Sequence, residues 1–222
     1  MNINISEVLR YLGYKNQALS DSTKQVIQDC MEEIETLVRA NYIYKCFDMQ
    51  KNDEEIKLVN TNIKLTGADI RKHLKDSARC FLMAVTIGGE IDFKIRYYEK
   101  IDLTKAIIMD ACATAAVETL CDEVEARIKE EVLKEGFGIT YRYSPGYGDL
   151  PIELQPYILS VLETQKKIGL TVSDSFILLP RKSVSAIIGV QESHIIRQHP
   201  GCKSCNSFKY CNFRKDGNYC GA

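Results

Sequence analysis

The sequence lacks any long apolar run. No hydrophobic stretch approaches the roughly 20 residues that a membrane-spanning helix needs. The first residues, MNINISEVLRYLGYK, also lack the basic and then apolar segments of a signal peptide. We therefore expect a cytoplasmic protein that makes no contact with a membrane.

The sequence also has almost no net charge, no internal repeats and no low-complexity segments. The chain has 29 basic and 30 acidic side chains, so its formal net charge is -1. A nearly neutral chain has no overall attraction for nucleic acids, and none is expected as a partner. Of the 222 residues, 45% are hydrophobic and 27% are charged, a balance that predicts a soluble globular protein with a substantial core.

Cysteine, in contrast, is abundant, with nine residues. Because no secretory signal is visible, these cysteines predict free thiols or metal ligands rather than a disulfide framework. Five are scattered through apolar patterns. The other four fall within the last 21 residues with the spacing Cys-x2-Cys-x5-Cys-x8-Cys, namely Cys202, Cys205, Cys211 and Cys220.

Four thiolates so close together are suited to one zinc ion or an iron–sulfur cluster. The alternative is a set of unbound or redox-active thiols. We predict two units, a folded domain over residues 1–200 and a Cys-rich metal- or cluster-binding tail over residues 201–222.

Hydrophobic periodicity gives the expected order of elements within the folded domain. Helices are predicted over 5–13, 21–40, 66–74, 90–100, 103–135 and 151–169. Strands are predicted over 41–49, 78–87, 139–143, 174–180 and 183–190, and further strand and turn over 54–67. Because strands and helices do not alternate regularly, the pattern indicates an α+β fold with a largely antiparallel sheet.

Some segments carry more specific expectations. The uninterrupted apolar run over 78–87 is typical of a strand buried on both faces. Small side chains over 111–118 would let another backbone or a flat ligand approach the long helix. The charge run over 123–135 predicts a solvated helix face, and His73 is expected on a helix surface.

One loop combines features of a turn with features of a site. The stretch TYRYSPGYGDLP, residues 140–151, holds three tyrosines, two glycines and two prolines around a single arginine. Arg142 offers a fork of donors that fits a carboxylate. Pro145 and Gly146 predict a turn whose backbone N–H groups are free to meet a ligand, and Tyr147 adds an aromatic face. A strand-to-helix turn whose tyrosines only pack is the alternative.

The segment from Arg142 to Tyr147 resembles the Arg-x-x-x-Gly-Tyr motif of the reactivation domain of cobalamin-dependent methionine synthase. The following stretch LETQKKIGLTVSDSFILLPRKSVSAIIGV is also similar to that family. Upstream, TIGGEIDFKI and DACATAAVETLCDEVEARI resemble its small stand-alone activation proteins. The resemblance covers about residues 5–192 and implies a twisted, largely antiparallel sheet with flanking helices.

The resemblance also implies a function. Domains of this family bind S-adenosylmethionine and present its methyl group to a cobalamin that another module holds, which restores methylcobalamin after the cobalt has been oxidised. The implied partners are a cobalamin-binding methionine synthase or other corrinoid protein and a flavodoxin- or ferredoxin-type electron donor. The chain would thus serve a methyltransferase activity in trans.

The resemblance assigns roles to single residues. Arg142 would hold the methionyl carboxylate, the backbone of the Tyr143-Ser144-Pro145-Gly146 segment would meet the adenosyl group, and Tyr147 would face the corrinoid as the catalytic residue. The family also uses an acidic residue on the long helix. Thr114 stands at that place here, and Glu118, one turn later, is the substitute.

Two other functions remain open on the sequence. The chain could be a non-catalytic, metal-stabilised binding or assembly module of a corrinoid methyltransferase system. Alternatively, the Cys-rich tail could carry an iron–sulfur cluster that delivers the reducing electron itself.

Overall fold

The structure is a computed structural model that describes residues 3–14, 17–193 and 209. Its centre is a six-stranded sheet in the order β3-β2-β1-β4-β8-β5, in which every neighbouring pair is antiparallel. The strands are β1 (Asn41–Lys51), β2 (Glu55–Leu58), β3 (Lys64–Thr66), β4 (Arg79–Thr86), β5 (Phe137–Ile139) and β8 (Ser183–Glu192). The predicted α+β class with a largely antiparallel sheet is confirmed.

Strand β4 lies in the middle of the sheet and is buried on both faces, as its apolar run predicts. Successive side chains of a strand point to opposite faces. Phe81, Met83 and Val85 accordingly join one core, whereas Leu82 and Ala84 join the other. The sheet therefore separates two hydrophobic cores.

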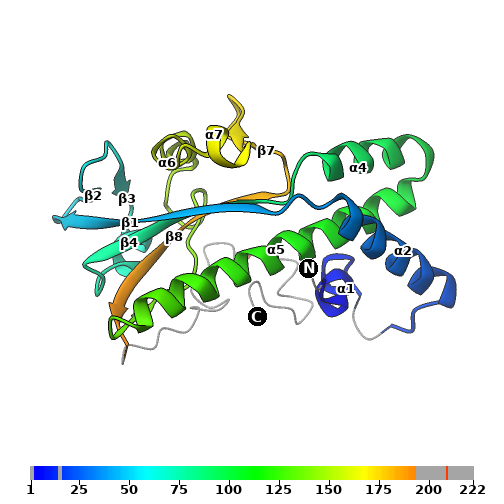
Figure 1. The fold of residues 1–222 in the computed structure, drawn as a ribbon, viewed down its shortest axis with the longest axis horizontal. Coiled ribbons are helices and arrows are strands. Elements are labelled where there is room, and N and C mark those ends of the chain that lie inside the picture. The colour runs from blue at the N-terminus through cyan, green and yellow to red at the C-terminus, as the bar shows by residue number, and fades with distance from the viewer. Residues whose placement is uncertain (1–2, 15–16, 194–208, 210–222) are drawn as a thin grey trace.

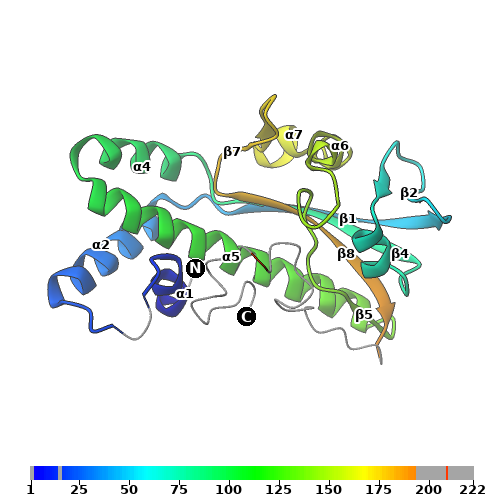
Figure 2. The ribbon, with the colours of Figure 1, turned by 180° about the vertical axis from the view of Figure 1, so that it is seen from behind.

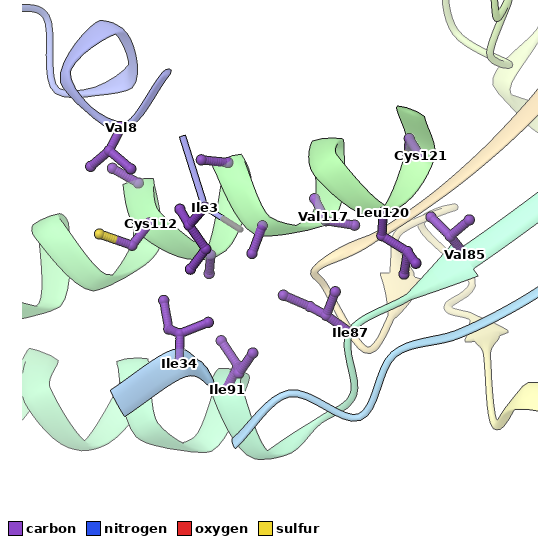
Figure 3. Packing of buried hydrophobic residues seen from close by; sticks show 14 of the residues in the cluster. Ile3, Val8, Ile34, Val85, Ile87, Ile91, Cys112, Val117, Leu120 and Cys121 are labelled. Atoms are coloured by element: carbon purple, nitrogen blue, oxygen red, sulfur yellow. The ribbon is translucent and has the colours of Figure 1, made fainter. Parts of the chain in front are cut away.

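Four helices contribute to the core on one face of the sheet. They are α1 (Ile5–Tyr11), α2 (Asp21–Leu37), α4 (Glu90–Ile101) and the long α5 (Leu103–Leu133). Helix α5 crosses this face diagonally, and α1, α2 and α4 gather around its first half (Figure 1). The small residues of α5 lie in this core, where Ala113 and Ala116 are completely buried. Val8 of α1 and Ile34 of α2 pack close to this part of α5 (Figure 3). The small side chains thus serve helix packing.

The opposite face carries shorter elements. These are α3 (Ala68–His73), the 3-10 helix η1 (Ile152–Leu154), α6 (Gln155–Leu162) and α7 (Thr164–Ile168). Figure 2 shows α6 and α7 on the side of the sheet away from α5. Ile158, Leu159 and Leu162 of α6 fill the second core. None of the helices in the described ranges is both long and apolar enough to cross a membrane.

The structure corrects some predicted elements. The helix expected over 151–169 starts as η1 and is broken at Glu163, which adopts a left-handed conformation with φ 55°. Gly169 ends α7 in the left-handed conformation, as predicted.

The strand expected over 174–180 is reduced to β7 (Leu178–Leu179), which pairs only with β6 (Thr171–Val172). A turn takes up the rest, because the N–H of Phe176 donates to the carbonyl of Ser173 and the N–H of Ser173 donates to Ile177.

Candidate functional site

The loop over residues 140–151 is anchored to the sheet at Thr140. The Thr140 N–H donates to the Gly189 carbonyl of β8 at 2.9 Å, and the Gly189 N–H donates to the Thr140 hydroxyl at 2.8 Å. The same hydroxyl lies 2.9 Å from Nε2 of His73. His73 is only 4% exposed, so the prediction of a surface position was wrong.

The chain stays extended through Tyr143. Strand β5 ends at Ile139, earlier than expected, and pairing with β8 resumes only at a bridge between Tyr143 and Ile187. Tyr143 contributes to the second core, and its ring lies 5.0 Å from that of His73. The neighbouring side chain of Arg142 reaches the opposite side, as alternation in an extended chain requires, and meets α5.

Arg142 is surrounded by three carboxylates of α5. Its Nη1 donates to Oδ1 of Asp122 at 2.7 Å and to Oε2 of Glu125 at 2.8 Å. Its Nη2 donates to Oε2 of Glu118 at 3.2 Å. The arginine side chain is only 21% exposed, so this cluster is partly shielded from water. The fold thus brings together the two residues, Arg142 and Glu118, that the sequence placed at one site.

Burial and charge compete within the cluster. Burial raises the pKa of Glu118 and of Glu125, and the adjacent Arg142 guanidinium offsets only part of that rise. Burial also opposes the charge of Arg142, yet the surrounding carboxylates outweigh it and raise the pKa of the guanidinium. The arginine is therefore a fixed cation that holds carboxylates in a poorly solvated place.

The turn after Arg142 differs from the prediction in one respect. The Gly146 N–H donates to the Leu150 carbonyl at 2.9 Å, and the Tyr147 N–H donates to the Ser144 carbonyl at 3.1 Å. These N–H groups are not free to meet a ligand, because the turn uses them itself. Pro145 is buried, so it holds the turn against the body of the protein.

Tyr147 projects from the tip of this turn. The residue is 66% exposed, and its ring lies 6.5 Å from the ring of Tyr143. Tyr147 therefore presents an aromatic surface at the tip of the turn.

Thr114, which the sequence resemblance aligned with an acidic residue of the family, lies on α5. Its hydroxyl accepts a hydrogen bond from Nζ of Lys182 at 2.8 Å, and the same Nζ pairs with Asp110 at 2.8 Å. Thr114 also lines a hollow of about 390 Å³ between α1, α4 and α5. Because residues three or four apart share a helix face, Asp110, Thr114 and Glu118 form a polar row on α5.

Asp122 and Glu125 were missed by the sequence reasoning. Glu125 belongs to the charge run that was expected to face solvent, but it points to Arg142 instead. The spacing of Glu118, Asp122 and Glu125 by four and three residues was the available signal, since it places three acids on one helix face.

The four cysteines proposed as metal ligands, Cys202, Cys205, Cys211 and Cys220, lie outside the described residues. Over 3–14 and 17–193, no group of three or more His, Cys, Asp or Glu side chains is arranged to hold a metal ion. Cys30, Cys46, Cys80, Cys112 and Cys121 are free thiols, in agreement with the expectation for this part of the chain.

Comparison with known proteins places the chain in a family. The family model described as "Vitamin B12 dependent methionine synthase, activation domain" matches residues 68–195. A solved structure, the MetH reactivation domain bound to AdoHcy, is similar with a TM-score of 0.61 and 16% identity, covering 85% of this chain and 70% of that chain. None of the curated proteins matches the sequence. At this identity the solved structure shows a shared fold, and the family match covers more than half of the chain. The chain therefore belongs to the activation-domain family of vitamin B12 dependent methionine synthase.

Proposed function

We propose that this protein binds S-adenosylmethionine and serves as a reactivation factor for a cobalamin protein. The observation that carries the proposal is the position of Arg142, whose guanidinium already holds carboxylate oxygens at 2.7 to 3.2 Å. The planar guanidinium donates hydrogen bonds to side-chain carboxylates here. The same N–H groups are suited to the methionyl carboxylate of S-adenosylmethionine. Membership of the activation-domain family supports this assignment.

Glu118 is the proposed contact for the ammonium group of the ligand. Its carboxylate lies against Nη2 of Arg142, so a carboxylate and an ammonium on one carbon atom would meet opposite charges side by side. The extended Tyr143-Ser144 backbone is proposed to meet the adenosyl group. In the turn, Pro145 and Gly146 set the distance from Arg142 to Tyr147.

The corrinoid is proposed to arrive on a partner, a cobalamin-binding methionine synthase or another corrinoid protein. Tyr147 is the proposed contact because it is the most exposed tyrosine of the loop. Cobalamin would be a substrate here: one electron from a flavodoxin- or ferredoxin-type donor reduces cobalt(II) to cobalt(I). The electron pair of cobalt(I) then attacks the methyl group of S-adenosylmethionine. The carbon–sulfur bond breaks, and the sulfur keeps the bonding pair, which leaves S-adenosylhomocysteine.

For the segment over residues 201–222 we propose a separate metal- or cluster-binding tail. Its four cysteines match the number of thiolate ligands at structural zinc and at iron–sulfur centres. Metal analysis of anaerobically purified protein tests this, with Cys202→Ser as the matched variant. Absence of zinc and iron from the full chain would contradict the proposal.

The binding proposal is tested by calorimetric titration of the full chain with S-adenosylmethionine. We expect saturable binding that is lost, by about a hundredfold or more, in Arg142→Ala, because a charge-assisted pair is removed. The matched control is Arg127→Ala, which removes an arginine of α5 that lies over the ring of Tyr42. The same sample, mixed with a cobalamin-loaded partner and a reductant, should form methylcobalamin.

Two results would contradict the proposal. The first is the absence of measurable S-adenosylmethionine binding, with or without the cobalamin-loaded partner. The second is equal binding by the wild type and Arg142→Ala, which would mean that the ligand sits elsewhere.

A further inference from the structure

We propose that Asp122 and Glu125 are specificity-determining residues that compete with the ligand for Arg142. This inference rests on the proposed S-adenosylmethionine site. Both side chains accept hydrogen bonds from Nη1 of Arg142, which the carboxylate of an amino acid would also use. Ligand binding would then be an exchange of one carboxylate for another.

A ligand carboxylate that uses Nη1 of Arg142 has to displace a side chain that is already bound there. Nη1 of an arginine carries two N–H groups. One donates to Asp122 at 2.7 Å and the other donates to Glu125 at 2.8 Å. A carboxylate that binds the Nη1–Nη2 edge in a bidentate manner needs one of those N–H groups. At least one of the two acids must therefore leave before such a ligand can dock.

The exposure of the side chains indicates which groups move. The Arg142 side chain is 21% exposed and is enclosed by α5, whereas the Asp122 side chain is 72% exposed. Asp122 can turn into solvent and be hydrated there, so its release costs little. Glu125 is 29% exposed and more firmly enclosed, and its displacement costs more. Asp122 is thus the first group to be exchanged.

Glu118 has a different place in the cluster. It contacts Nη2 rather than Nη1, at the longer distance of 3.2 Å. It can remain bound while a ligand carboxylate takes Nη1. Three carboxylates around one guanidinium also leave an excess of negative charge, which favours a ligand that brings positive groups along with its carboxylate. A sulfonium amino acid satisfies this condition better than a simple carboxylic acid does.

The test measures affinities of the full chain and of the variants Asp122→Asn and Glu125→Gln by calorimetry. The probes are S-adenosylmethionine and 5′-methylthioadenosine, which lacks the amino acid end. We expect each variant to bind S-adenosylmethionine about threefold to tenfold more tightly, because weakening a direct competitor for the guanidinium outweighs the loss of one negative charge nearby. The affinity for methylthioadenosine should not change. Glu123→Gln is the matched control, since it removes the same charge from an exposed position of α5.

The outcomes separate this inference from the proposed function. Binding of S-adenosylmethionine by the wild type but not by Arg142→Ala supports the proposed site. If Asp122→Asn and Glu125→Gln then bind with the same affinity as Glu123→Gln, the proposed competition is contradicted. Weaker binding by both variants also overturns it, provided that circular dichroism and melting show intact folds. Binding that is measurable only in the variants would support the competition, but it would contradict the proposed function of the wild type. If no form binds, both proposals fail.

Discussion

The carboxylate of Asp149 accepts a hydrogen bond from the backbone N–H of Asp69 at 3.1 Å, although 80 residues separate them in the chain. It also accepts from the N–H of Ala68 at 2.5 Å. Helix α3 has glycine at its own N-cap and no capping side chain there, so the capping group comes from the loop that carries Arg142. The loop and α3 are therefore stabilised together.

Asp149→Ala should destabilise the protein by about 1 kcal/mol, the usual cost of a lost N-cap. The free energy of unfolding in urea measures the effect. Asp149→Asn is the control, because its amide oxygen still accepts a hydrogen bond and should preserve most of the stability. Equal stability of the wild type and Asp149→Ala would show that water replaces the cap.

Gly148→Ala should be more damaging, at about 2 kcal/mol, because two costs combine. The residue has φ +54°, and an added Cβ would lie 2.5 Å from Oδ2 of Asp69 and also against the Tyr143 hydroxyl. Gly136→Ala is the comparison, since Gly136 has φ +84° but no atom within 4 Å of an added Cβ. Chemical denaturation of both variants should give the larger loss for Gly148→Ala. A larger loss for Gly136→Ala would contradict this account.

Glu33 of α2 contacts side chains of α4 and α5. We expect these contacts to make the stability of the protein depend on pH. It lies 2.6 Å from Nζ of Lys94, 3.3 Å from Nζ of Lys105 and 2.8 Å from the Tyr98 hydroxyl. Partial burial disfavours its charge, but the hydrogen bonds from these partners outweigh burial and lower the pKa of Glu33. The stabilisation is therefore present above the unfolded pKa of about 4.3 and is lost as the pH falls through the lower folded value.

Glu33→Gln should accordingly cost about 1 kcal/mol at pH 7. The difference from the wild type should shrink below about pH 4. Urea unfolding between pH 3 and 7 would measure it. Glu32→Gln, at an exposed position of the same helix, should show no such difference. A difference that grows toward acid pH would reverse the assigned sign.

Tyr147→Ala should separate partner contact from folding. Because this side chain is largely exposed, its removal should change the free energy of unfolding by less than about 0.5 kcal/mol. S-adenosylmethionine affinity should stay within about threefold, while the rate of methylcobalamin formation on the partner falls by about tenfold or more. Tyr157→Ala, at a tyrosine that is 57% exposed on α6, is the control. Unchanged formation of methylcobalamin would remove Tyr147 from the proposed interface.

Local sequence patterns predicted most of the elements for a physical reason. Strand β4 can be recognised in the sequence because a strand buried on both faces gives an unbroken apolar run. Helix α5 can be recognised because its apolar spacing continues without Pro or Gly. The break at Glu163 has no such signal. There the Thr164 hydroxyl donates to the Leu170 carbonyl at 2.8 Å inside the core, a tertiary contact that the helix pattern does not contain.

The candidate site was predictable only in part. The motif identified Arg142, but its contacts with Asp122 and Glu125 depend on how α5 crosses the sheet. Asp149 was likewise hidden, because its partners on α3 are distant in sequence. Residues that serve one site from two elements become visible only when the packing of those elements is known.

The order of the sheet has a consequence for how a partner can attach. Its two outer strands, β3 and β5, have three residues each, but β2 pairs with β1 only over Met49–Lys51. On that side of β1, no strand of the described residues pairs with residues 41–48. A short edge offers a foreign chain few backbone groups, whereas this longer edge is the kind to which an extended segment can add as a strand. A partner can therefore meet the sheet through backbone hydrogen bonds along β1 as well as through side chains.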